Sequence, residues 1–268
     1  MSAARGRADQ TKCLEQLRGL AGASAAYAAG DSEGQLLPAH PIADVNPLHD
    51  EGYFDYGGKT GSNNVWNGNR WGPNSPRTAP TRPLNSLLFG TPGETTDFSL
   101  FRCPRDDGLP ERSSEGGGDV WDDQMARQPM FKSVGTSFWG NAYRAFGALG
   151  KGTARGFWSV GVLLRPTSRI PSAAQTVLYG EAIAWEQIAR TGNASGPYFV
   201  LRGLPGWHAN HRFNMSFCDG HAESIRMAWH VLTSGTDPMG PDGSALHVRG
   251  PDFRFDCRPD GLIADAPE

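Results

Sequence analysis

Residues 207–221, "WHANHRFNMSFCDGH", bring three histidines, an aspartate and a cysteine together in one short segment. His208 and His211 are three residues apart, and Asp219 and His221 lie across an Asp-Gly turn signal. One interpretation is therefore a metal site with two imidazoles and a carboxylate. The other is a structural loop in which His208 or His211 hydrogen-bonds the backbone of a hairpin. Because the sequence offers no second group of ligands, we favour the structural interpretation and predict no metal.

Acidic loops are a second source of candidate ligands. The segments "DDG" at 106–108 and "DVWDDQ" at 119–124 offer carboxylate oxygens of the kind that calcium prefers. Neither segment has the spacing of an EF-hand, so we expect solvated loop acids, with calcium as the alternative. We predict no other cofactor.

Nucleophilic catalysis has little support in the sequence. It contains no Gly-x-Ser-x-Gly elbow, Cys103 is followed directly by Pro104, and Glu181 is a lone acid in a strand-like segment. We therefore predict that the protein is not an enzyme. A metal-dependent enzyme ranks third among the interpretations, behind a structural protein and a recognition module.

Two tryptophans stand in an asparagine-rich loop, "NNVWNGNRWG" at 63–72. Exposed Trp and Asn side chains are suited to stacking on and hydrogen-bonding sugars, so Trp66 and Trp71 are candidate glycan contacts. The 8 tryptophans of the chain are spread along it rather than grouped, which favours Trp66 and Trp71 as core residues. A secreted carbohydrate-binding or other recognition module is the alternative function.

The four cysteines are far apart in the sequence and form no Cys-x-x-Cys pair; they are Cys13, Cys103, Cys218 and Cys257. This spacing argues against a zinc ribbon and against a redox motif. An even number fits two disulfides in an exported protein or four unrelated thiols in a cytosolic one. The number alone does not choose between them.

Composition excludes several functional classes. The net charge is −3 and the 25 Lys and Arg residues are scattered, so nothing indicates a nucleic-acid surface. The longest apolar runs, such as "VGVLL" at 160–164, are far shorter than the roughly 20 residues that span a bilayer. The 35 glycines and 20 prolines make up about a fifth of the chain, which predicts extensive loops.

One long helix is expected near the N-terminus, over residues 8–29. Its apolar residues recur at spacings of three and four: Leu14, Leu17, Ala21, Ala25 and Ala28. Gly30 is expected to end this helix in the left-handed conformation that glycine tolerates. Because one face of the helix is apolar, it requires a partner surface.

Short strands provide that surface. Runs rich in aromatic and β-branched residues predict antiparallel strands within 133–143, 157–164, 173–182, 213–220 and 221–228. Asp219-Gly220 stands between the last two runs, which predicts a hairpin with a two-residue type I′ turn. A short helix is expected over 83–89, within a region that glycine, proline and asparagine otherwise break into loops.

Several segments, in order, resemble the pseudopilin-like proteins that carry a His-X9-Asp-Gly signature and are abundant in planctomycetes. The signature residues are His208, Asn214, Phe217, Asp219, Gly220 and His221, with ten rather than nine residues between His208 and Asp219. The other similar segments are "QTKCLEQLRGLAGASAAYAAGDSEGQLLP" (10–38), "RPLNSLLF" (82–89), "LFRCPRDDG" (100–108), "TSFWGNAY" (136–143) and "QTVLYGEA" (175–182).

The resemblance implies a pilin-like α+β fold, an N-terminal helix packed on an antiparallel sheet with long loop insertions. It also implies export, which favours disulfides, with Cys13 bridging Cys103 and Cys218 left to pair with Cys257. Family members begin with a leader and an apolar anchor in the inner membrane, which this sequence lacks. We expect a truncated or engineered domain or a misplaced start, rather than true loss of the anchor, because "ARGRADQTKC" resembles the stretch after such an anchor.

The implied function is that of a structural subunit or minor component of a type II secretion pseudopilus or a type IV pilus-like assembly. Its partners would be other pilin-like subunits, contacted through the N-terminal helix, at the periplasmic or extracellular face of the cell envelope. The expected organisation is a helix at 1–30, a globular domain at 31–228 with a loop-rich insertion at 44–132, and a C-terminal extension at 229–268.

Overall fold

The structure is a computed structural model of the 268-residue chain. It describes residues 3–41, 54–62, 71–108, 128–142, 144–148, 155–159, 161–184, 206–208 and 212–226. The predicted C-terminal extension at 229–268 lies outside these residues.

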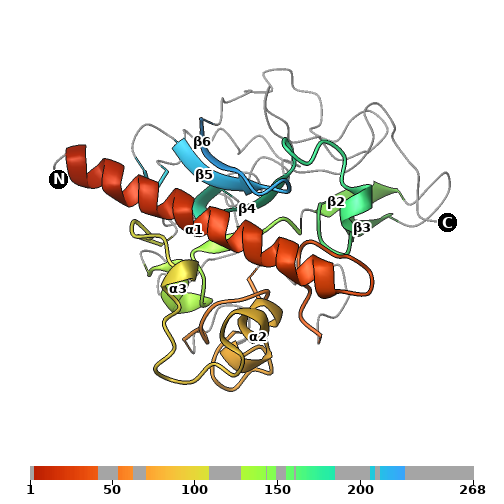
Figure 1. The fold of residues 1–268 in the computed structure, drawn as a ribbon, viewed down its shortest axis with the longest axis horizontal. Helices are drawn as coiled ribbons and strands as arrows, with labels where there is room; N and C mark the ends of the chain where they lie inside the picture. The colour runs from red at the N-terminus through yellow and green to blue at the C-terminus, as the bar shows by residue number, and fades with distance from the viewer. Residues whose placement is uncertain are drawn as a thin grey trace.

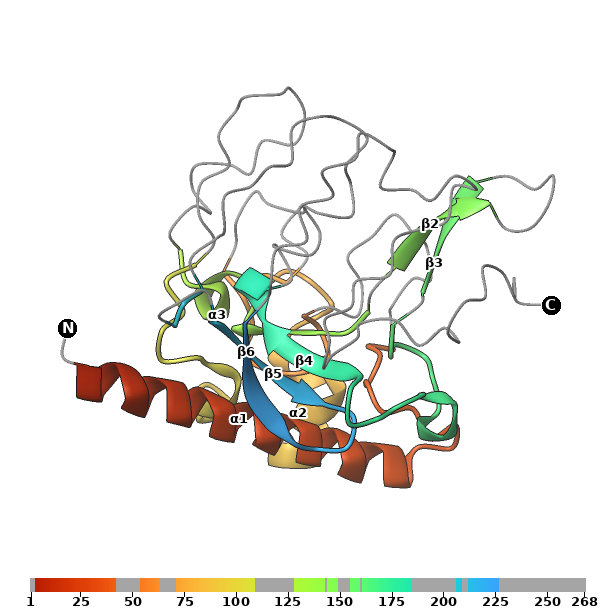
Figure 2. The ribbon, with the colours of Figure 1, turned by 90° about the horizontal axis from the view of Figure 1, so that it is seen from above.

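A long N-terminal helix lies across a four-stranded antiparallel sheet, which makes the fold α+β (Figures 1 and 2). The helix is α1 (Ala3–Gly30), and the sheet has the strand order β1-β4-β5-β6. These strands are β1 (Phe138–Gly140), β4 (Val177–Glu181), β5 (Arg212–Phe217) and β6 (Ala222–Arg226). The predicted helix on an antiparallel sheet is therefore confirmed at the level of fold class.

A separate hairpin and several short helices complete the described elements. The hairpin pairs β2 (Arg144–Ala148) with β3 (Arg155–Ser159) and lies apart from α1 (Figure 2); β2 was not predicted. The helix expected over 83–89 is α2 (Pro83–Phe89). The remaining short helices are η2 (Ala79–Thr81), η3 (Ser99–Phe101), α3 (Met130–Ser133) and η4 (Thr167–Arg169).

The buried face of α1 differs from the predicted apolar stripe. Cys13, Leu17, Leu20 and Ser24 are buried against the rest of the protein, whereas Ala25 is exposed. The buried residues keep the spacing of three and four that defines a helix face, but the row includes polar side chains. The contact face that the hydrophobic pattern predicted for the helix therefore differs slightly from the face that is buried in the structure.

The end of α1 also differs from the prediction. Gly30 is the last residue of the helix and is not among the glycines with positive φ. The chain leaves the helix through Asp31, whose backbone N–H donates to Tyr27 O at 3.0 Å, and the left-handed glycine is Gly34, at φ 65°.

Where β5 and β6 form the sheet face beneath α1, this face carries small and polar side chains. Gln10 of α1 donates to Ser224 Oγ at 2.8 Å, and Ser224 is the cross-strand partner of Asn214. Paired residues of antiparallel strands point to the same face, so Asn214 lies on the helix side, together with Ser216 two positions on. These short side chains leave room for the helix to approach closely.

The β5–β6 hairpin is present, but its turn is not the predicted two-residue type I′ turn. That turn requires positive φ at both central residues, whereas only Gly220, at φ 95°, has it. Gly220 N–H donates to Phe217 O at 3.0 Å, and Phe217 N–H donates to His221 O at 2.9 Å. The connection is therefore a three-residue loop, Cys218 to Gly220, with a left-handed glycine that forms a bulge.

Two buried polar residues at the start of α2 hold the loop region together. The guanidinium of Arg82, fully buried, donates to the carbonyl oxygens of Phe54, Arg77, Gly57 and Val134. The amide of Asn85 accepts from Gly58 N–H at 2.9 Å and donates to Ala79 O at 2.8 Å. Two polar side chains thus replace the backbone pairing that an irregular segment lacks.

Candidate functional site

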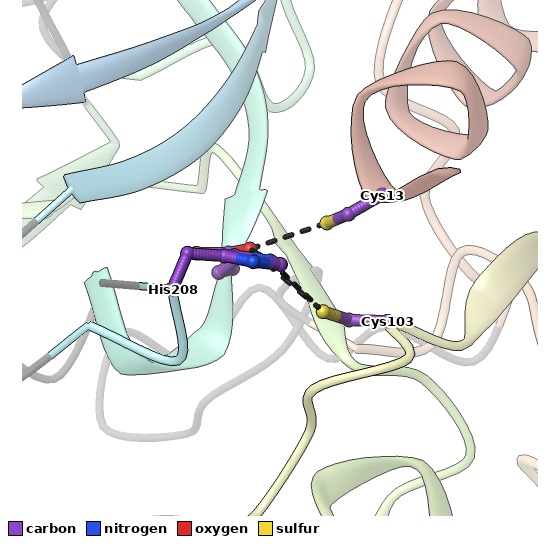
Figure 3. Close-up of side chains that lie close together, drawn as sticks. Cys13, Cys103 and His208 are labelled. Carbon is purple, nitrogen blue, oxygen red and sulfur yellow. Dashed lines mark hydrogen bonds and ion pairs between the residues drawn. The ribbon is translucent and has the colours of Figure 1, made fainter. Parts of the chain in front are cut away.

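Four potential metal ligands converge between α1, the loop after η3 and the sheet (Figure 3). They are Cys13, Cys103, Glu181 and His208, and one donor atom of each lies within 4.8 Å of every other. All four are buried, with exposed fractions of 0%, 1%, 0% and 5%. Among the residues that the structure describes, this is the one group of three or more His, Cys, Asp or Glu residues that could hold a metal ion.

Each member of this cluster comes from a different element. Cys13 lies on the buried row of α1, and Glu181 is the last residue of β4. Cys103 follows η3 and precedes Pro104, and its sulfur accepts from Arg105 N–H at 3.4 Å. His208 is fixed just before β5 by an isolated antiparallel bridge to Arg212. Only the tertiary fold brings these four residues together.

The four side chains make a compact set of polar contacts. His208 Nε2 lies 2.9 Å from Glu181 Oε1 and 3.5 Å from Cys103 Sγ. Cys13 Sγ lies 3.2 Å from Glu181 Oε1, and Cys103 Sγ lies 3.8 Å from the same oxygen. Glu181 Oε1 is therefore the point on which the other three donors converge.

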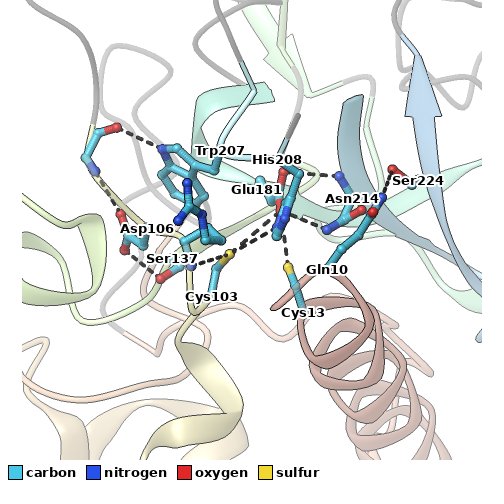
Figure 4. A network of polar contacts seen from close by, with 12 residues as sticks. Gln10, Cys13, Cys103, Asp106, Ser137, Glu181, Trp207, His208, Asn214 and Ser224 are labelled. Atoms are coloured by element: carbon cyan, nitrogen blue, oxygen red, sulfur yellow. Dashed lines mark hydrogen bonds and ion pairs between the residues drawn. The ribbon is translucent and has the colours of Figure 1, made fainter. Parts of the chain in front are cut away.

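Asn214 orients the carboxylate of Glu181 from the neighbouring strand (Figure 4). Its backbone N–H donates to Glu181 Oε2 at 3.1 Å, and its side-chain amide donates to Oε1 at 3.1 Å. Both oxygens of Glu181 thus have a donor outside the cluster. This outer contact fixes the orientation of the carboxylate, as outer-shell residues do around metal ligands.

Burial and mutual charge set the electrostatics of the cluster. Burial alone would lower the pKa of His208, but the hydrogen bonds to Cys103 and Glu181, and their charges, raise it to about 10. Burial raises the pKa of the Cys13 thiol well above its usual value, and the hydrogen bond and charge of Cys103 and the charge of Glu181 raise it further. Burial thus favours the neutral thiol of Cys13, whereas the acceptors around His208 favour its protonated imidazole.

A second buried network lies beside the cluster and involves Asp106 (Figure 4). Its carboxylate accepts from the N–H groups of Gly108, Met130 and Phe131 and from Ser137 Oγ, at 3.1, 2.8, 2.8 and 2.6 Å. Burial raises the pKa of Asp106, while these hydrogen bonds lower it. Both oxygens are therefore occupied by protein donors, so the predicted solvated or calcium-binding role of 106–108 is wrong for Asp106. The segment 119–124 lies outside the described residues.

The metal site considered from the sequence is not assembled in the structure. His221 and Asp219 are exposed, pair with each other at 2.6 Å between Nδ1 and Oδ1, and are not part of the cluster. The ring of His221 stacks on that of Phe217 at 4.2 Å between centroids. His211 lies outside the described residues. The tip of the hairpin is therefore a self-contained turn. The ring of His208 contacts the side chains of Glu181 and Cys103 rather than the hairpin backbone that the structural interpretation expected.

The predicted Cys13–Cys103 disulfide is not formed in the structure. Both residues are free thiols, and they lie beside each other within the cluster. The second predicted bridge, from Cys218 to Cys257, cannot be placed because Cys257 lies outside the described residues. Cys218 itself is half-buried in the turn after β5.

Trp71 is a core residue rather than an exposed platform for sugars. It is 2% exposed, and its ring meets that of Phe54 edge-on at 5.7 Å between centroids. Trp66 lies outside the described residues. For Trp71, the glycan-contact interpretation is therefore wrong, and the core interpretation is confirmed.

A cavity of about 600 Å³ lies elsewhere on the surface, lined among others by Lys59, Phe98, Arg102 and Phe131. None of the four cluster residues lines it. The four donors are thus buried and do not line this opening, a property of structural rather than substrate-binding sites.

Sequence reasoning named all four residues but did not join them. Cys13 and Cys103 were assigned to a disulfide, His208 to a hairpin loop, and Glu181 was set aside as a lone acid. A signal was nevertheless present, because four of the ordered segments that resemble the pseudopilin-like proteins each contain a metal-ligand residue type.

Comparison of the chain with protein-family models, with curated proteins and with solved structures found no match. Among the described helices, none is long and apolar enough to cross a membrane.

Proposed function

We propose that this protein is a non-enzymatic structural subunit or minor component of a type II secretion pseudopilus or type IV pilus-like assembly of the cell envelope. The observation that supports the proposal is the arrangement of α1, which precedes the sheet in the chain and lies across it (Figure 1), as the family resemblance leads us to expect. The ordered sequence resemblance points to the same class. The proposed role requires no catalytic turnover.

The N-terminal turns of α1 are the part of the helix that we propose contacts a neighbour. The 28 residues of α1 correspond to about 42 Å of helix, and its first turns extend past the sheet (Figure 2). Residues 4–8 are exposed, whereas Leu17, Leu20 and Ser24 further along are buried within the protein. The first two turns would therefore contact adjacent pilin-like subunits, while the following turns hold the domain.

The proposal can be tested by site-specific photo-crosslinking in cells that make the full-length protein. A photo-reactive residue at Ala4, in the exposed first turns, should form adducts with a pilin-like subunit or a second copy of this chain in the envelope fraction. The matched control is Glu223, which is exposed on β6, on the sheet face opposite α1. Equal adducts from both positions, or a protein that stays soluble without adducts, would contradict the proposal.

A further inference from the structure

We propose that Cys13, Cys103, Glu181 and His208 bind a zinc ion that joins α1 and the loop after η3 to the sheet. The donor set is two sulfurs, one imidazole nitrogen and one carboxylate oxygen, all of which are zinc ligands in proteins. This proposal is independent of the assembly proposed above, since zinc content and subunit contacts are measured separately.

Four of the six donor–donor separations are close to those of a tetrahedral site, and the other two are within 4.8 Å. Zinc–ligand bonds of about 2.0–2.3 Å place tetrahedral ligands roughly 3.3–3.8 Å apart. The measured separations are 3.2 Å (Cys13 Sγ to Glu181 Oε1), 3.5 Å (Cys103 Sγ to His208 Nε2) and 3.8 Å (Cys103 Sγ to Glu181 Oε1). The shortest, 2.9 Å between His208 Nε2 and Glu181 Oε1, would lengthen by a few tenths of an ångström on binding.

The surroundings are those of a structural site. Two groups already orient the ligands from outside, since Asn214 donates to both oxygens of Glu181 and Arg105 N–H donates to Cys103 Sγ. Such outer contacts are characteristic of protein metal sites. Four protein ligands would complete the coordination of zinc, and their burial leaves no open position for a substrate, so we assign a structural rather than a catalytic zinc.

A bound ion would also cross-link Cys13 and Cys103, the two residues that the family resemblance joins by a disulfide. Cys13 and Cys103 lie 90 positions apart, and Cys13 and Glu181 are 168 positions apart. A cation held by all four segments would link the helix, the loop region and the sheet at one point. Zinc binds the thiolate form of cysteine and the neutral imidazole of histidine, so binding at this site would be coupled to proton release.

The direct test is the metal content of the full chain, purified without reductant or chelator from zinc-supplemented cells. We expect about one zinc per chain, and at least a tenfold lower content in Cys103→Ser and in His208→Asn. The matched controls Cys218→Ser and His221→Asn replace the same residue types at the β5–β6 turn and should retain the zinc. Intact-mass measurement of the same sample reports whether Cys13 and Cys103 are joined by a disulfide.

A second measurement does not depend on the variants folding. The unmodified chain, stripped of metal and titrated with Co²⁺, should develop the visible and near-ultraviolet bands of tetrahedral thiolate-bound cobalt at one equivalent, and zinc should abolish them. Absence of these bands, a chain purified without zinc, or a Cys13–Cys103 disulfide in the purified protein would each overturn the proposal. Iron or copper retained in place of zinc would overturn the assignment of the metal.

Discussion

Replacing Arg82 with methionine should strongly destabilise the protein. Arg82 is fully buried, and burial lowers the pKa of its guanidinium to about 10, so it is still charged at neutral pH. It donates to Gly57 O at 2.8 Å, to Val134 O at 2.9 Å, and to two further carbonyls at 3.2 Å. Methionine matches the aliphatic stem of arginine but has no donor, so Arg82→Met leaves these carbonyls without that partner.

The expected loss follows from these four contacts. A buried acceptor left unsatisfied costs about 1–3 kcal/mol, and the two short bonds to Gly57 and Val134 should dominate. Because relaxation and water recover part of the loss at the two longer contacts, we expect a decrease in unfolding free energy of about 3–5 kcal/mol. At roughly 2–4 °C per kcal/mol, the melting temperature should fall by roughly 6–20 °C.

Urea unfolding followed by circular dichroism measures this change. The matched control is Arg7→Met, at an exposed position of α1, where we expect a change within about 0.5 kcal/mol. Arg82→Lys retains the charge but not the planar arrangement of donors, so its loss should be intermediate. If Arg82→Met and Arg7→Met unfold within about 1 kcal/mol of each other, the guanidinium does not stabilise the loop region and the reasoning is wrong.

Three other predictions concern the helix, the hairpin and pH. Leu17→Asp buries a charge at a position that is 0% exposed, so cooperative thermal melting should be lost, whereas the exposed control Ala25→Asp should melt normally. Gly220→Ala should lower the unfolding free energy by about 1–2 kcal/mol, because Gly220 has φ 95° and the space around it is open, so that the loss is backbone strain alone. Asparagine tolerates positive φ better than alanine, so Gly220→Asn should lower the unfolding free energy less. Equal losses in the two variants would show that backbone strain is not the cause. Burial beside Arg77 and Arg82 lowers the pKa of His40, against the effect of Asp55. The folded state therefore disfavours protonation of His40, so the unfolding free energy should decrease as pH drops below about 6.5. Urea unfolding of His40→Gln should not show this decrease.

The sequence determined the classes of element and much of their order. Spacings of three and four predicted the long helix, and Pro83 together with Gly90 bounds the short helix that was expected over 83–89. Runs rich in aromatic and β-branched residues predicted β4, β5 and β6, and Asp219-Gly220 predicted the hairpin of β5 and β6. These features depend on local periodicity and on the backbone preferences of glycine and proline, which are readable within a window of a few residues.

Tertiary structure decided which residues meet, and here local patterns carry little information. Asn214 and Ser216 alternate with apolar residues as an exposed face would, yet both are buried on the side that α1 covers. Cys13 could pack as a small hydrophobic residue, as free cysteines commonly do. Its position on the helix instead places it against Glu181, 168 residues away. The four ligands come from segments that only the packing of α1 on the sheet brings together. A lone acid, two distant cysteines and a loop histidine therefore become a single candidate metal site in the folded chain.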